Sequence, residues 1–168
     1  MSADDPRWVV LAGLRNAIVE DLAFAVRLWD GRGPAAPGGR RDDATRTLEK
    51  ALQKALRGGY STFGRASEYV LSLAGETRPT GGQWHARLLT MVLSPSRSRP
   101  ALVPGSAGDL RELRLFRHVA MHGDLEFDLD RAAPTAQAAR RLVATLPGAF
   151  DAFGRDFGLL APPEPPPS

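Results

Sequence analysis

Arg117 and His122, which are separated by four residues, combine a permanent cation with a group that titrates near neutral pH. A guanidinium presents planar donors suited to phosphate, and an imidazole can accept or release a proton at physiological pH. Such a pair could cleave RNA without a metal. The imidazole would take the proton of a ribose 2′-OH or protonate the leaving oxygen, and the guanidinium would stabilise the charge that develops on phosphorus. This spacing also arises by chance, so the pair needs support from the surrounding sequence.

The stretch around this pair, residues 110–129, reads LRELRLFRHVAMHGDLEFDL and predicts a helix that ends beside the pair. Its apolar residues recur three or four positions apart, which is typical of one buried helical stripe. Gly123 is a typical residue for the end of such a helix. We expect Asp109 or Ser106 to cap the start of the helix. The pair would then lie at a helix end, where side chains reach a cleft rather than a neighbouring helix.

This segment resembles the HEPN superfamily and, within it, the HepT-like toxins. Their signature is an arginine, a polar residue and, a few residues later, a histidine, matched here by Arg117, His118 and His122. Upstream, GGYSTFGRASEYVLSLA at 58–74 is similar to the second helix of the family, and GGQWHARLL at 81–89 resembles its Trp-His element. The resemblance covers roughly residues 43–157.

The resemblance implies a metal-independent endoribonuclease toxin, which works without a cofactor and belongs to a type II/VII toxin–antitoxin pair. Its partners would be the RNA substrate, a nucleotidyltransferase-type (MntA-like) antitoxin and a second copy of the chain. Two signatures would meet in one cleft of this homodimer. His122 would be the acid–base residue, Arg117 would bind the phosphate, and His118 would orient His122 or contact RNA. The products would carry 2′,3′-cyclic phosphate and 5′-hydroxyl ends.

The sequence departs from the family pattern at two positions beside His122. Asp124 stands where many members carry a tyrosine, which in some members the antitoxin modifies with nucleotide, and Met121 stands where a basic residue is common. A carboxylate at this place would repel phosphate if it pointed into the cleft, so Asp124 is predicted to modulate the site. An alternative function is therefore a catalytically weakened HEPN module that binds nucleic acid or a partner protein. An unrelated helical adaptor is a third hypothesis.

Four further arginines are candidates for RNA contacts, and no metal site is predicted. The arginines are Arg111 and Arg114 on the predicted helix and Arg97 and Arg99 in the loop before it. The chain has no cysteine, and its three histidines offer no defined ligand spacing. The remaining histidine, His85, could face the cleft, but without ligand spacing to another histidine we favour a packed or capping role.

The composition predicts one soluble domain in the cytoplasm. The 168-residue chain fits one HEPN-like helical domain, predicted at residues 1–160, followed by a disordered proline-rich tail at 161–168. We identify neither a signal peptide nor an apolar run of the roughly 20 residues that a membrane span needs. Of the 22 basic residues only Lys50 and Lys54 are lysines, which leaves 20 arginines, but the net charge of +3 is weak evidence for nucleic acid.

Apolar periodicity predicts an all-α, up-and-down bundle of four main helices plus a short one. The other helices are expected near residues 8–29, from Asp42 or Asp43 to 73, over 83–93, and from a cap at Asp130 to about 157. Gly58-Gly59 interrupts the second helix, but the apolar phase continues across the pair, which favours one long helix. Pro147 should kink the last helix. The segment after Gly123 is expected to be extended.

Overall fold

Five α-helices make up the described part of the chain, and no β-strand occurs in it. The computed structural model describes residues 5–34, 42–122 and 129–161, with the backbone alone at 119–122 and 130. In chain order the helices are α1 (Pro6–Asp30), α2 (Asp43–Leu73), α3 (Trp84–Leu93), α4 (Ala107–His122) and α5 (Ala133–Asp156), with short 3₁₀ helices η1 (Pro104–Ser106) and η2 (Leu129–Ala132). The predicted all-α bundle of four main helices plus a short one is confirmed. None of these described helices is long and apolar enough to cross a lipid bilayer.

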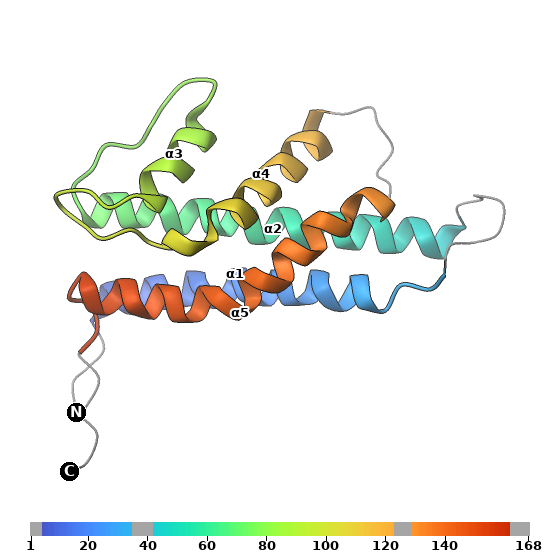
Figure 1. Ribbon diagram of the computed structural model, residues 1–168, viewed down its shortest axis with the longest axis horizontal. Helices are drawn as coiled ribbons and strands as arrows, with labels where there is room; N and C mark the ends of the chain where they lie inside the picture. The colour runs from blue at the N-terminus through green and yellow to red at the C-terminus, as the bar shows by residue number, and fades with distance from the viewer. Residues whose placement is uncertain (1–4, 35–41, 123–128, 162–168) are drawn as a thin grey trace, which may run out of the picture.

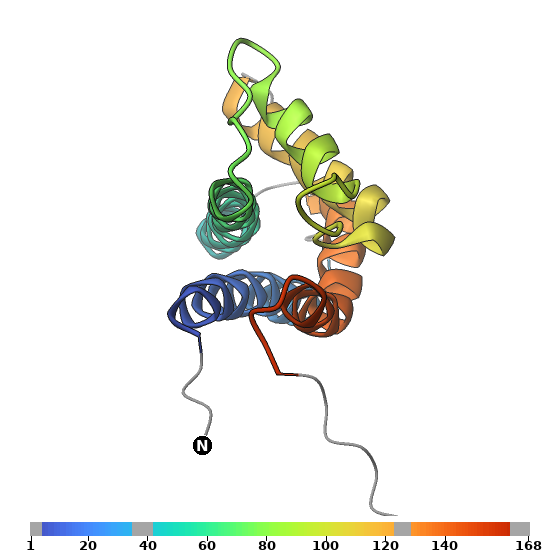
Figure 2. The ribbon, with the colours of Figure 1, turned by 90° about the vertical axis from the view of Figure 1, so that its left-hand side faces the viewer.

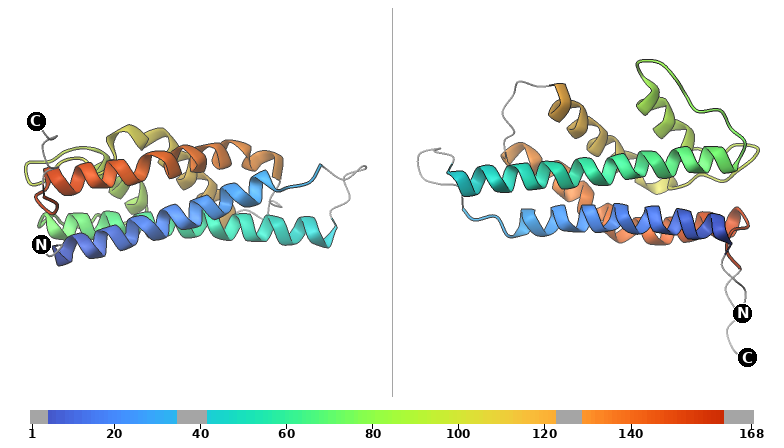
Figure 3. Two further views of the ribbon diagram at one scale, coloured as in Figure 1. Left: turned by 90° about the horizontal axis from the view of Figure 1, so that it is seen from below. Right: turned by 180° about the vertical axis from the view of Figure 1, so that it is seen from behind.

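The two longest helices form an antiparallel pair on which the rest of the bundle is built (Figures 1 and 3). α2 begins where predicted, because the Asp42 carboxylate accepts a hydrogen bond from the backbone N–H of Thr45 at 2.8 Å. α5 packs along α1, while α4 packs against both α2 and α5. Figure 2 shows α1 and α5 side by side, with α2 stacked on α1. One apolar core runs through these contacts.

The Gly58-Gly59 pair lies inside the continuous helix α2, as the apolar phase predicts. A Cβ atom at Gly59 would lie 2.7 Å from Cδ2 of Leu22, and one at Gly58 would lie 2.7 Å from Oδ2 of Asp21. Both neighbours belong to α1, so the glycines let the two helices approach closely at this level. The two glycines lower the helix propensity of α2 but permit its close packing against α1.

The boundaries of α4 and α5 differ in part from those expected. α4 begins at Ala107, so Asp109 lies in its first turn, where the carboxylate accepts a hydrogen bond from Arg141 Nη2 at 2.8 Å. The prediction that Asp130 caps the last helix is wrong: Asp130 lies within η2, and Ala132 occupies the cap position of α5 without a side-chain bond. α5 continues through Pro147 and bends near its middle (Figure 1). Residues 123–128 and 162–168 lie outside the described residues, whereas Leu129 and Asp130, the end of the segment expected to be extended, belong to η2.

Candidate functional site

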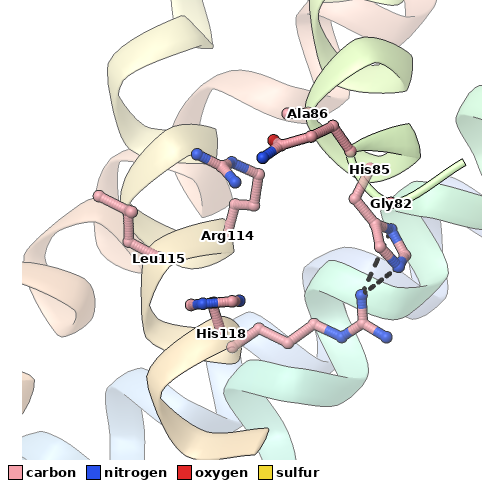
Figure 4. A pocket seen from close by; sticks show the side chains of 8 residues that line it. Gly82, His85, Ala86, Arg114, Leu115 and His118 are labelled. Carbon is pink, nitrogen blue, oxygen red and sulfur yellow. Dashed lines mark hydrogen bonds between the residues drawn. The ribbon is translucent and has the colours of Figure 1, made fainter. Parts of the chain in front are cut away.

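A pocket of about 500 Å³ lies between the start of α3 and the second half of α4 (Figure 4). Of its lining residues that the structure describes, four carry a guanidinium or an imidazole and none carries a carboxylate. Such a set suits an anionic ligand with several acceptor oxygens, such as a phosphodiester. The lining residues are Gly82, Gln83, His85, Ala86, Arg114, Leu115, Arg117 and His118.

Helical periodicity brings the α4 residues of the site together. Arg117 and His118 lie three and four positions after Arg114, so all three are on one face of the helix. Leu115 forms the outer edge and is 51% exposed, which is unusual for a leucine. His122 is the last residue of α4 and lies one turn beyond His118. Its side chain, like all of Asp124, falls outside what the structure describes.

His85 enters the site from α3 and binds the arginine of the signature. Arg117 Nη1 lies 3.0 Å from Nε2 of His85 and 3.4 Å from Nδ1 (Figure 4). The Trp84 ring stacks on the imidazole, with centroids 3.4 Å apart and an interplanar angle of 29°. His85 therefore faces the pocket, which was the less favoured of the two interpretations of this residue. The Trp-His element at 81–89 was the signal for it.

The surroundings of His85 favour its neutral form. Burial lowers the pKa of the imidazole, and the positive charges of Arg117 and, more weakly, Arg114 lower it further. Glu68 of α2 opposes this shift, but its carboxylate also forms a salt bridge with Arg78. The net shift is downward, so His85 is uncharged at neutral pH and can accept the hydrogen bond from Arg117.

A buried tyrosine lies in the core beside the cationic side of the pocket. Tyr60 of α2 is 4% exposed, and burial raises its pKa to about 12, although Arg114 and Arg117 both act to lower it. The phenol therefore keeps its proton at physiological pH. Because Tyr60 immediately follows Gly59, the close approach of α1 and α2 also fixes the backbone that carries this ring.

A polar clamp holds α3 in place and thereby positions His85. The Glu76 carboxylate accepts hydrogen bonds from the hydroxyls of Ser96 and Ser98 at 2.5 and 2.8 Å, and from Arg99 Nη2 at 3.2 Å. The same Arg99 guanidinium donates to the carbonyl of Met91 at 2.7 Å, in the last turn of α3. The clamp ties the segments before and after α3 to each other.

This placement corrects the expectation that Arg99 is available to RNA. Its side chain is 1% exposed, and its bonds serve the protein itself. Of the other predicted RNA contacts, Arg114 lines the pocket, whereas Arg111 is exposed one turn earlier on α4 and Arg97 is exposed in the loop. The structure thus brings Arg114, Arg117 and His118 together and separates them from Arg97 and Arg99.

Among the described residues, no three His, Asp or Glu side chains are grouped so that they could hold a metal ion. The fold and the pocket define an all-α bundle protein with a pocket lined by guanidiniums and imidazoles. The sequence model of the HepT-like protein family matches residues 51–157, which is more than half of the chain. The protein therefore belongs to the HepT-like proteins, a HEPN-type family, as the resemblance predicted. Neither the curated proteins nor the solved structures contain a match to this chain.

Proposed function

We propose that this protein is the metal-independent endoribonuclease toxin of a HEPN/nucleotidyltransferase toxin–antitoxin module. The observation that carries the proposal is the pocket at the signature, where two guanidiniums and two imidazoles converge and no carboxylate is among the described lining residues. An RNA phosphodiester offers a negative charge to the guanidiniums, and its cleavage needs two proton transfers that imidazoles can carry, one from the ribose 2′-OH and one to the leaving 5′-oxygen. Membership of the HepT-like family supports the same reaction class.

In the proposed reaction, the ribose 2′-oxygen attacks phosphorus and the 5′-oxygen of the next nucleotide leaves. An imidazole removes the 2′-OH proton, and a second imidazole, now acting as an acid, protonates the leaving oxygen. The products are a 2′,3′-cyclic phosphate and a 5′-hydroxyl. Arg117 stabilises the charge on the phosphorane, His122 carries the proton, and His118 orients His122 or contacts RNA. A homodimer with two signatures in one cleft supplies both the acid and the base.

The proposal is tested by incubating purified protein with RNA in excess EDTA and analysing the ends of the fragments. We expect fragments with 2′,3′-cyclic phosphate ends, and a loss of at least about 100-fold in rate for His122→Ala, which removes the proton-transferring group. Arg117→Ala should lose a similar amount. Arg46→Ala is a matched control, because Arg46 is an exposed arginine in the first turn of α2 and 14 positions before Tyr60, a rise of about 20 Å. Cleavage that stops in EDTA and returns with a divalent ion would refute the mechanism.

The second candidate function is a catalytically weakened module that binds nucleic acid or a partner protein. It is favoured by Asp124 and Met121, which replace a common tyrosine and a common basic residue beside His122. This candidate predicts that the unaltered protein binds RNA with an affinity that depends on Arg114 and Arg117, while the RNA stays intact. Size-exclusion chromatography with light scattering, carried out on the same samples, tests the homodimer.

The antitoxin is proposed to be a nucleotidyltransferase acting in the cytoplasm. Where the family's tyrosine is absent, transfer of nucleotide to that position cannot be the means of control, so neutralisation here would rest on binding or on another acceptor. Growth arrest on expression of the protein, relieved by a co-expressed nucleotidyltransferase from the neighbouring reading frame, would support the pairing. Mass spectrometry of the relieved protein then tells binding from modification.

A further inference from the structure

The contact between His85 and Arg117 joins two segments that the proposed mechanism does not otherwise connect. His85 lies in the first turn of α3, and Arg117 follows 32 positions later on α4. Both line the same pocket, and the hydrogen-bond contacts from the Arg117 guanidinium to the His85 ring are the dashed lines of Figure 4. The imidazole is also stacked against Trp84, which restrains the orientation of the ring.

The direction of this hydrogen bond follows from chemistry. A guanidinium only donates, so the imidazole nitrogen that binds Nη1 must present its lone pair. Nη1 lies within hydrogen-bond distance of both ring nitrogens, 3.0 Å from Nε2 and 3.4 Å from Nδ1, so the neutral ring offers it a lone pair in either tautomer. A second cation, Arg114, lines the same pocket, so a charged imidazole would face two guanidiniums at close quarters.

We propose that His85 is a positioning residue, which holds Nη1 of Arg117 so that the remaining donors of the guanidinium meet the phosphodiester in a fixed orientation. The inference rests on the proposed function and assigns a role to a residue outside the Arg-x4-His signature. Arginine has five N–H donors in a planar fork, so a bond from one of them to His85 still leaves donors that can face a phosphate. Without this bond the long arginine side chain samples other rotamers, and its donors are no longer pre-oriented.

A structural role for His85 makes a different prediction, which two substitutions can separate. His85→Phe retains an aromatic ring for stacking on Trp84 but removes the acceptor. His85→Gln places an amide oxygen near the position of Nε2 and so retains the acceptor without the ring. If His85 only packs, Phe should be the better replacement; if it positions Arg117, Gln should be.

The experiment measures single-turnover cleavage of a short RNA, and the affinity for the same RNA with 2′-O-methyl groups, which cannot be cleaved. We expect His85→Phe to lower both the cleavage rate and the affinity about 10-fold, which corresponds to the loss of one hydrogen bond to a charged group. His85→Gln should stay within about 3-fold of the parent in both measurements. In an Arg117→Ala background, His85→Phe should have no further effect. Arg46→Ala, whose residue lies outside the pocket, should match the parent.

Three results would each overturn the inference. His85→Phe could cleave and bind RNA as well as the parent, or His85→Gln could lose as much as His85→Phe. The losses of His85→Phe and Arg117→Ala could also be additive. If the Phe variant does not fold, NMR of the unaltered protein decides: a held guanidinium gives separate Nη signals for Arg117, and a single averaged signal refutes the bond. The RNA could stay intact while the affinity for the methylated RNA still falls from the parent to His85→Gln and further to His85→Phe. In that case the ribonuclease proposal fails and the positioning role stands. If the parent neither cleaves nor binds RNA, both fail.

Discussion

Alanine substitutions at two glycines of the same helix should change stability in opposite directions. Gly59 and Gly64 both lie inside α2, so each replacement by alanine gains helix propensity of about 1 kcal/mol. At Gly64 no atom lies within 4 Å of the added Cβ, so this gain should appear in full. Gly64→Ala is therefore expected to stabilise the protein by about 0.5–1 kcal/mol.

At Gly59 the added carbon meets the opposite helix. It would lie 2.7 Å from Cδ2 and 2.9 Å from Cγ of Leu22, distances that real side chains do not tolerate. Leu22 is 1% exposed and surrounded by core, so it cannot move away freely. Overpacking of this kind costs about 1–3 kcal/mol, which exceeds the gain in propensity. Gly59→Ala should therefore destabilise the protein by about 1 kcal/mol.

Urea denaturation and thermal unfolding, both followed by circular dichroism, measure the difference between the two variants. A separation of about 2 kcal/mol corresponds to about 4–8 °C in Tm for a domain of this size. The parent should lie between the variants. If Gly59→Ala is as stable as Gly64→Ala, α1 and α2 are not in close contact at this level, and our explanation of the Gly58-Gly59 pair is wrong.

Three further predictions concern carboxylates. Glu76→Ala removes the counter-charge of the buried Arg99 and should lower the free energy of unfolding in urea by about 3 kcal/mol; a loss below about 0.5 kcal/mol would contradict the clamp. Burial raises the pKa of Glu76, but its hydrogen bonds and the charge of Arg99 outweigh this effect, so the net shift of the pKa is downward. The contribution of Glu76 to the stability of the parent should therefore disappear as the pH falls below about 4. Burial, with a smaller effect of Glu20, raises the pKa of Asp21. Asp21→Asn should therefore stabilise the protein at pH 7 and lose this advantage below about pH 4. A stability difference between variant and parent that is the same at both pH values would refute this prediction. Asp124→Asn should increase RNA cleavage by removing charge near His122, and Asp124→Tyr should increase it more; equal or lower rates in both, with His122→Ala inactive, would show that Asp124 is not a brake.

Helices whose apolar residues recur with helical periodicity could be predicted from the sequence. The apolar phase of α2 runs through Gly58-Gly59, and periodicity is a property of the sequence that needs no knowledge of the partner helix. The start of α5 was not predictable in the same way. Asp130 is a good capping residue in isolation, but the chain makes a 3₁₀ turn first, and α5 begins three residues later. Local capping preferences of about 1 kcal/mol are readily overridden by the packing of an incoming segment.

The candidate site was predictable only where its residues share one helix. Arg114, Arg117 and His118 follow from helical spacing, whereas His85 depends on how a separate helix docks against α4. A lone histidine without ligand spacing gives no sign of such a contact by itself, and only the resemblance of 81–89 to the family's Trp-His element pointed to this residue.

The arginines show most clearly why residue type alone does not predict a binding surface. Arg97 and Arg99 lie two positions apart in one polar loop, yet Arg97 is exposed and Arg99 is buried. The difference comes from Glu76, which lies 23 positions before Arg99 and is brought beside it by the end of α2. There Gly75, at φ +69°, ends the helix, and the N–H of Glu76 bonds to the carbonyl of Leu71 at 2.9 Å. A glycine at a helix end thus determines which arginine supports α3, and through α3 it fixes where His85 meets Arg117.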